Sequence, residues 1–189
     1  MIKDEEQIAS AVASGDRDAF RTLYNCTVRS LSAVCSRYIS DVEDVHDVLQ
    51  ESYIDIFRNI SRFKWKGEGS LRAWMTRIVV NKSIDFLREQ TKMQNVELTD
   101  NISADIPDEP QTDADDVPMD AIVQMIRELP AGYRTVFNMF VVEHIPHKEI
   151  AQRLGITETT SASQLHRAKA LLAMKINEYR KENSLMARI

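Results

Sequence analysis

Residues 147–172 combine short polar side chains and cations in a pattern suited to contact with nucleic acid. The stretch HKEIAQRL is followed by Gly155 and Ile156 and then by TETTSASQLHRAKALL, which predicts two helices joined by a tight turn. The polar residues expected to face outward from the second helix are Thr159, Thr160, Ser163, Gln164, Arg167 and Lys169. Hydroxyl, amide and guanidinium groups of this kind reach phosphates and base edges in a DNA groove. We interpret the segment as a DNA-binding helix-turn-helix; the alternative is an ordinary helical hairpin.

A second polar and basic stripe is predicted on residues 71–88. On a helical wheel, an arc of about 80° gathers Trp74, Arg77, Asn81, Asp85 and Arg88. The loop before this helix adds Phe63, Lys64, Trp65 and Lys66. Aromatic rings stack on unpaired bases and cations neutralise phosphates, so the ensemble suits single-stranded nucleic acid. The alternative is that Phe63 and Trp74 are core residues and that the charges solvate a face.

A third surface is acidic. The predicted helix over residues 42–60 gathers on one side Asp44, Asp47, Gln50, Glu51 and Asp55. Such a face offers a negative surface to a basic partner. The alternative is a solvated face without a partner.

These segments must be positioned by helices, because turn formers are scarce. The 189 residues include only 5 Gly and 5 Pro, which disfavours an all-β or a glycine-rich phosphate-binding fold. Two cysteines are too few for a disulfide framework. No apolar run is long enough to span a membrane, and the first ten residues are too acidic for a signal peptide. We expect a cytoplasmic, all-α protein.

Charge divides the chain into blocks. The net charge is -5 overall, but residues 62–92 and 121–189 are basic, whereas residues 1–61 and 93–120 are acidic. Residues 94–118 contain three prolines, many acids and no aromatic residue, which predicts a disordered linker. Residues 93–120 would span about 30 Å as a flexible coil and about 90 Å when stretched. We therefore predict two small helical domains on either side of an acidic tether.

Hydrophobic periodicity predicts the individual helices. We expect helices over residues 17–39, 42–60, 119–129 and 131–143, a long helix that is capped by Ser70 and reaches residue 90, and the helix pair around Gly155. Asp16, Asp41 and Ser70 are the candidate N-caps. Residues 63–70 form a loop. The inward face of the second helix is expected to carry Val45, Val48, Leu49, Tyr53, Ile56 and Phe57.

Nothing in the sequence indicates catalysis. The four histidines, His46, His144, His147 and His166, lack the spacing of a metal motif. A P-loop, a nucleophile elbow and paired carboxylates are also missing from the sequence. We expect no enzyme activity, no cofactor, no metal and no small-molecule substrate.

The three surfaces, in this order, resemble the sigma factors of bacterial RNA polymerase, in the sigma-70 family and its extracytoplasmic-function (ECF) group. The similarity extends over essentially the whole chain. The stretch DVHDVLQE at residues 44–51, with Tyr53 and Phe57 after it, is similar to the family's polymerase-docking helix. The resemblance therefore implies core-polymerase contacts at Asp44, Asp47, Leu49, Gln50, Glu51 and Ile54.

The basic segment resembles the part of the family that opens the minus-ten promoter element. In the family, the loop corresponding to residues 64–70 captures a flipped base, and Asn81 matches a position that lines its pocket. The implied contacts with unpaired DNA are Phe63, Lys64, Trp65, Lys66, Trp74, Arg77, Asn81 and Arg88.

The helix-turn-helix resembles the family's reader of the double-stranded minus-35 element. The implied contacts are Thr159, Thr160, Ser163, Gln164, His166, Arg167 and Lys169. Many relatives carry basic residues where this chain has Ala162 and Gln164, which implies fewer phosphate contacts. The variant TTSASQLHRAK is similar to that of members from Bacteroidetes.

The resemblance implies a sigma-two domain over residues 1–92, a disordered linker over 93–118 and a sigma-four domain over 119–189. The implied partners are core RNA polymerase, promoter DNA and an anti-sigma factor, which in the family is often membrane-anchored. The alternative function is a helix-turn-helix transcriptional regulator with an N-terminal sensing domain, which would have no use for the basic loop and helix of residues 62–92.

Overall fold

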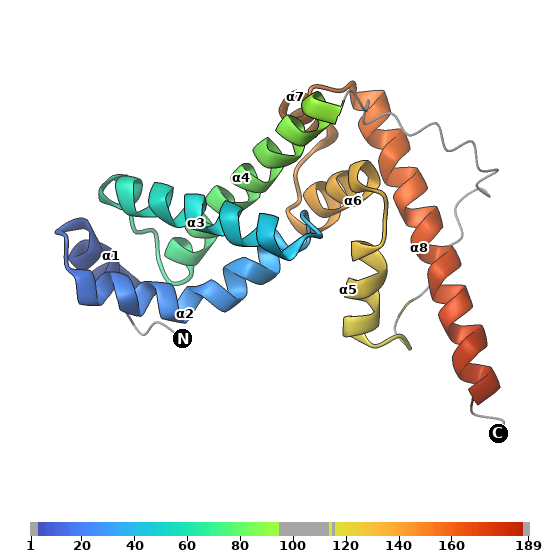
Figure 1. The fold of residues 1–189 in the computed structure, drawn as a ribbon, viewed down its shortest axis with the longest axis horizontal. Helices are drawn as coiled ribbons and strands as arrows, with labels where there is room; N and C mark the ends of the chain where they lie inside the picture. The colour runs from blue at the N-terminus through green and yellow to red at the C-terminus, as the bar shows by residue number, and fades with distance from the viewer. Residues whose placement is uncertain (1–3, 95–113, 115, 187–189) are drawn as a thin grey trace. The chain divides into compact units, whose positions relative to one another are not determined.

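The computed structural model describes residues 4–94, 114 and 116–186, which form helices and no strand within these ranges. They fall into two compact units, Met1–Glu89 and Gln90–Ile189 (Figure 1). The expected all-α class is confirmed. Most of the acidic linker, residues 95–113 and 115, lies outside the described residues.

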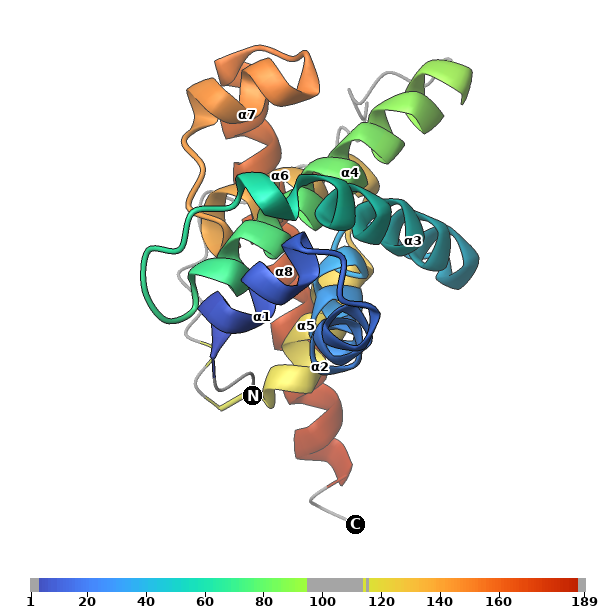
Figure 2. The ribbon, with the colours of Figure 1, turned by 90° about the vertical axis from the view of Figure 1, so that its left-hand side faces the viewer.

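The N-terminal unit contains four α-helices and one short 3₁₀ turn among its described residues. These are α1 (Glu5–Ala13), α2 (Arg17–Cys35), α3 (Val42–Asn59), the 3₁₀ turn η1 (Ile60–Arg62) and α4 (Ser70–Gln94), whose last residues extend past the unit boundary at Glu89 (Figures 1 and 2). Helix α1 was not predicted. It packs on α2 and on η1, and it buries Ala9 and Val12.

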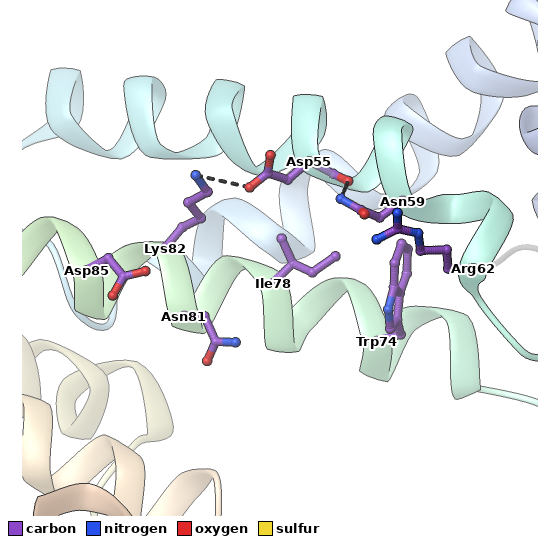
Figure 3. A pocket seen from close by; sticks show the side chains of 8 residues that line it. All are labelled: Asp55, Asn59, Arg62, Trp74, Ile78, Asn81, Lys82 and Asp85. Atoms are coloured by element: carbon purple, nitrogen blue, oxygen red, sulfur yellow. Dashed lines mark hydrogen bonds and ion pairs between the residues drawn. The ribbon is translucent and has the colours of Figure 1, made fainter. Parts of the chain in front are cut away.

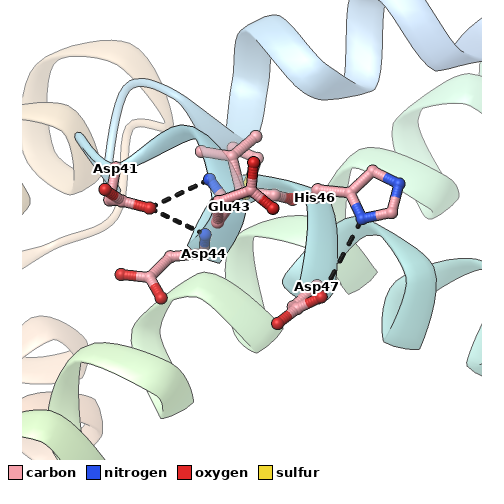
Figure 4. Close-up of polar contacts among 7 residues, drawn as sticks. Asp41, Glu43, Asp44, His46 and Asp47 are labelled. Atoms are coloured by element: carbon pink, nitrogen blue, oxygen red, sulfur yellow. Dashed lines mark hydrogen bonds and ion pairs between the residues drawn. The ribbon is translucent and has the colours of Figure 1, made fainter.

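An aspartate side chain caps the N-terminus of each of the helices α1, α2 and α3. The Asp16 carboxylate accepts from the Asp18 and Ala19 backbone N–H groups at 2.9 and 3.1 Å. In the same way, Asp41 caps α3 by accepting from Glu43 and Asp44 at 2.9 and 3.1 Å (Figure 4). Both predicted caps are confirmed, and each satisfies N–H groups that have no partner inside the helix. Ser70 is not a cap: it is the first residue of α4, and its hydroxyl accepts from the Lys66 N–H at 3.2 Å.

The core of the N-terminal unit joins α2, α3 and α4. Leu23, Ile56 and Met75 are each fully buried. At its centre, the Thr27 and Tyr53 hydroxyls lie 2.9 Å apart in a hydrogen bond, and burial raises the pKa of Tyr53 to about 12. The predicted inward face of α3 is correct except for Phe57, which is 48% exposed.

The C-terminal unit is built on one long helix. Its elements are α5 (Met119–Arg127), α6 (Ala131–Phe137), the π-helical turn η2 (Asn138–Val142), α7 (His147–Leu154) and α8 (Glu158–Met186) (Figure 1). Its core contains Val117, Met125, Leu129, Tyr133, Ala168, Leu172 and Ile176. Val117 is buried and Asp116 pairs with Arg180 of α8, so packed structure begins before the predicted boundary at residue 118.

The turn between α7 and α8 has helix-turn-helix geometry. Gly155 ends α7 in the left-handed conformation at φ 70°, and the Ile156 N–H returns to the Ala151 carbonyl at 3.1 Å. Thr157 then caps α8, because its hydroxyl accepts from the Thr160 N–H at 3.0 Å. The predicted helix pair and its glycine turn are confirmed.

We expect Gly155→Ala to destabilise the C-terminal unit by about 1–2 kcal/mol, because a Cβ strains this left-handed backbone. The strain is purely conformational, since a Cβ at Gly155 would meet no atom within 4 Å. Urea unfolding of the full chain, followed by circular dichroism, should show the loss, and Gln152→Ala on the exposed face of α7 is the control. The unfolding transition followed by tryptophan fluorescence should be unchanged, because both tryptophans, Trp65 and Trp74, lie in the N-terminal unit.

Two further properties concern function. None of the helices that the structure describes combines the length and apolarity needed to cross a membrane. Among the same residues, no three or more His, Cys, Asp or Glu side chains gather as a metal site would require.

Candidate nucleic-acid interface

A groove of about 470 Å³ runs between α3 and α4. Residues at intervals of three or four along α4 form one wall, which is the spacing that places side chains on one helix face. The groove is lined by Asp55, Asn59, Arg62, Trp74, Ile78, Asn81, Lys82 and Asp85 (Figure 3). It therefore combines an aromatic ring, an amide and charges of both signs.

Lys82 spans the groove and joins its two walls. Its Nζ lies 3.0 Å from an Asp55 carboxylate oxygen and 3.5 Å from one of Glu51 (Figure 3 shows the Asp55 contact). The hydrogen bond to Asp55 raises the pKa of Lys82, so this amine stays protonated at neutral pH. Lys82 was not among the predicted site residues, because consecutive helix residues point about 100° apart and Lys82 therefore lies outside the arc of the predicted stripe.

The aromatic residues of the basic segment divide into two groups. Phe63 and Trp74 are half-buried and pack against each other, with ring centroids 5.5 Å apart and planes at 45°. Trp65 in the loop is 48% exposed, and Lys64 and Lys66 beside it are exposed. The pair thus supports the loop, whereas Trp65 presents a stacking surface.

The predicted polar stripe lies on the surface of α4. Arg77, Asn81 and Asp85 are exposed, and Arg88 is half-buried with its guanidinium 3.9 Å from the Asp85 carboxylate. The structure therefore gathers these side chains on the accessible side of the helix, next to the groove.

The residues implied as core-polymerase contacts lie along α3, and all but Leu49 are exposed or half-buried. Asp47, Gln50, Glu51 and Ile54 are exposed and Asp44 is half-buried, while His46 lies 3.8 Å from Asp47 (Figure 4). Leu49 is only 8% exposed. Leu49 belongs to the inward stripe that packs the helix into its own unit, so little of its surface is accessible, and its role as a polymerase contact stays a prediction.

An apolar surface next to this acidic face was missed. A groove of about 540 Å³ between α2 and α3 is lined by Arg17, Phe20, Arg21, Tyr24, Tyr53, Ile54 and Phe57. Phe57 and Tyr24 are 48% and 40% exposed, and the Phe20 and Phe57 rings meet edge to face at 5.2 Å. Sequence periodicity placed Phe57 on the inward face of α3, but the structure exposes it at this groove. Only the packed structure shows that the apolar faces of α2 and α3 extend beyond the area in which the two helices pack against each other.

The second helix of the helix-turn-helix presents most of the predicted contacts. Thr159, Ser163 and Lys169 are exposed, whereas Thr160 and His166 are half-buried. Gln164 is 4% exposed, so the expectation that it faces outward is wrong. The reason is its position between buried Ser161 and Ala168 at helical spacing, on the side of α8 that faces its own unit.

Two contacts hold this helix against its neighbours. Arg167 is half-buried, and its Nη1 donates to the Tyr133 hydroxyl of α6 at 3.3 Å. Ser161 forms a hydrogen bond at 2.9 Å with Nδ1 of His147 from α7, and the His147 ring stacks on Phe140 at 4.4 Å. The sequence pointed to Arg167 but not to these partners, which only the packing of α6 and α7 reveals.

Comparison with known proteins matches both units to described families. Residues 23–93 match the family described as "Sigma-70 region 2", and residues 119–172 match "Sigma-70, region 4". The chain is 26% identical over 182 residues to the ECF RNA polymerase sigma-E factor of Haemophilus influenzae, covering 91% of this chain and 95% of that protein.

Two further relatives align over most of their length. The ECF RNA polymerase sigma factor SigW of Bacillus subtilis is 27% identical over 177 residues, covering 88% of this chain and 94% of that protein. The ECF RNA polymerase sigma factor SigM of Mycobacterium tuberculosis is 29% identical over 171 residues, covering 90% and 83%.

Proposed function

Because the chain belongs to the sigma-70 family, in its extracytoplasmic-function group, we propose that it binds core RNA polymerase and directs promoter recognition and DNA melting. One observation carries this function: region 2 and region 4 both match within one chain, in that order, region 2 on the N-terminal unit except for residues 90–93 and region 4 on the C-terminal unit. The protein is thus an initiation factor that adds sequence specificity to a polymerase.

The division of labour between the units follows the two matches. Residues 1–92 form the part that docks on polymerase and melts the minus-ten element, and residues 119–189 form the part that reads the minus-35 element. Residues 93–118 connect them. Promoter elements about 25 base pairs apart are separated by roughly 85 Å along the duplex, which is close to the stretched length of this acidic connection.

Polymerase docking is assigned to the exposed side of α3. Asp47, Gln50 and Glu51 supply charge and hydrogen bonds, and half-buried Asp44 adds a carboxylate at one end. Ile54 continues this surface into the apolar groove between α2 and α3. An apolar centre with a polar rim is the anatomy of a protein interface.

Minus-ten melting is assigned to the loop of residues 63–69 and the exposed stripe of α4. Exposed Trp65 offers a ring to an unpaired base, and Lys64, Lys66 and Arg77 offer cations to the phosphates. Flipping a base costs a few kcal/mol, and stacking recovers about 1–3 kcal/mol per base. Asn81 at the groove supplies donors and an acceptor for a base edge.

Minus-35 reading is assigned to the N-terminal half of α8. Thr159, Ser163 and Lys169 are exposed there, with half-buried Thr160, His166 and Arg167 at the edge of the same surface. Exposed Ala162 lacks the basic side chain of many relatives, so fewer phosphates are contacted. The variant TTSASQLHRAK supports a kinship with ECF members from Bacteroidetes.

We expect Lys169→Ala to weaken holoenzyme binding to a promoter fragment uniformly across sequences. Removal of one phosphate contact should reduce the slope of log affinity against log salt by about 1. The measurement is a salt titration of binding to a labelled fragment. Lys181→Ala, an exposed lysine farther along α8, should leave the slope unchanged. An unchanged slope for Lys169→Ala would remove this residue from the interface.

The remaining assignments follow from the same family. The partners are core RNA polymerase, promoter DNA and an anti-sigma factor that covers the binding surfaces when the protein is inactive. We propose that the chain acts in the cytoplasm, where promoters are, and that it has no catalytic activity, cofactor or small-molecule substrate of its own.

Co-purification with core polymerase separates this function from the alternative of a helix-turn-helix regulator with a sensing domain. A sigma factor forms a stoichiometric complex with purified core polymerase in size-exclusion chromatography without DNA. A regulator of the alternative kind elutes separately from core polymerase and binds DNA alone.

A further inference from the structure

The first turn of α4 takes a hydrogen-bond partner from a distant part of the chain. The opening N–H groups of a helix have no acceptor inside it. Ser70 accepts from Lys66 and does not supply the cap. Instead, the Leu71 N–H donates to Oε2 of Glu5 at 3.1 Å, and Glu5 lies in α1, 66 residues earlier.

Helix α1 contacts both ends of the loop of residues 63–69. It packs on η1, which immediately precedes this loop, and through Glu5 it holds the first turn of α4, which follows it (Figure 2). Between these ends, Gly67 and Gly69 adopt left-handed φ values of 117° and 83°, with open space around each. Two glycines of this kind give the loop many accessible conformations unless its ends are fixed.

We propose that Glu5 is a positioning residue for promoter melting: by capping α4 from α1, it fixes the loop that presents Trp65 to unpaired DNA. The inference rests on the proposed function and deepens it. A carboxylate suits this place because it accepts a charge-assisted hydrogen bond and complements the positive end of the helix dipole. Trp74, which supports Phe63, lies one turn beyond the capped residue, so loss of the cap loosens the loop at its C-terminal end.

Three variants of the full chain isolate the hydrogen bond. Glu5→Ala removes the acceptor. Glu5→Gln keeps an acceptor oxygen at the same length without the charge. Glu6→Ala removes an exposed acid from the neighbouring position of the same helix and is the matched control.

The experiment uses each variant as holoenzyme with core polymerase, on a genomic fragment that supports run-off transcription by the wild-type holoenzyme. Promoter opening is measured by permanganate reactivity of unpaired thymines. For Glu5→Ala we expect about fivefold less opening, the effect of losing one helix cap. Glu5→Gln should open within about twofold of the wild type, since its side-chain oxygen still accepts, and Glu6→Ala should open as the wild type does. Affinity for core polymerase should stay unchanged in all three.

Amide exchange at Leu71, measured by NMR on the free protein, tests the cap itself. Exchange should accelerate in Glu5→Ala and not in Glu6→Ala. The proposal is overturned if Glu5→Ala opens DNA as well as the wild type, if Glu5→Gln is as defective as Glu5→Ala, or if Glu5→Ala loses polymerase binding in proportion to opening. If no fragment is opened by the wild-type holoenzyme, the proposed function fails and the positioning role fails with it, whereas accelerated exchange at Leu71 would still establish the cap.

Discussion

Replacement of both Arg77 and Asn81 by alanine should block promoter opening while leaving the affinity for core polymerase intact. Both side chains are exposed on α4, so their removal leaves the core of the N-terminal unit unchanged. Each is expected to contribute about 1–3 kcal/mol through contacts with unpaired DNA, as hydrogen bonds to charged or buried groups do. Loss of both contributions should lower the amount of open complex by roughly two orders of magnitude or more.

Permanganate footprinting of holoenzyme on an active promoter measures this effect. Arg72→Ala is the control, because it removes an exposed arginine from another face of the same helix. Arg72→Ala should give a normal footprint. An intact footprint in the double variant would show that the stripe on α4 does not contact melted DNA.

The second large effect is expected at the polymerase-docking surface. Asp47→Lys combined with Ile54→Asp reverses a charge on the acidic face and places a carboxylate at the edge of the apolar groove. Both residues are exposed, so the fold should persist. Substitutions at the centre of an interface cost about 2 kcal/mol or more each, so core-polymerase affinity should fall at least about a hundredfold.

Equilibrium binding of labelled protein to purified core polymerase tests the loss. Glu178→Lys on the exposed side of α8 makes the same charge reversal at a distance and should bind as the wild type does. Retained affinity in the double variant would move the polymerase contact away from α3. Weakened binding by Glu178→Lys alone would point to overall charge instead of a local surface.

Local signals predicted much of the fold. Asp16 and Asp41 have the short acceptor side chain that caps a helix, and Gly155 tolerates the left-handed backbone of the turn, so these positions follow from single residues. Helix α1 did not follow from sequence because nine residues are too few for a stable helix in isolation. Its stability comes from packing on α2 and η1.

The candidate site shows the same division between local and tertiary information. Periodicity grouped the stripe on α4 correctly but placed Phe57 in the core and Gln164 on the surface. Whether a residue at the edge of an apolar helix stripe is buried depends on how far the neighbouring helix covers it. The periodicity of a single helix carries no information about that coverage. Lys82 and Glu5 were missed for a related reason: each acts through a partner from another helix.

Run-off transcription with purified core polymerase on a library of genomic fragments tests the central claim most directly. The account predicts discrete transcripts that require this protein, with a shared sequence element upstream of their start sites. It also predicts that the Arg77→Ala, Asn81→Ala double variant yields few transcripts although it still binds polymerase. A purified chain that binds core polymerase yet directs no discrete transcript from any fragment would contradict it.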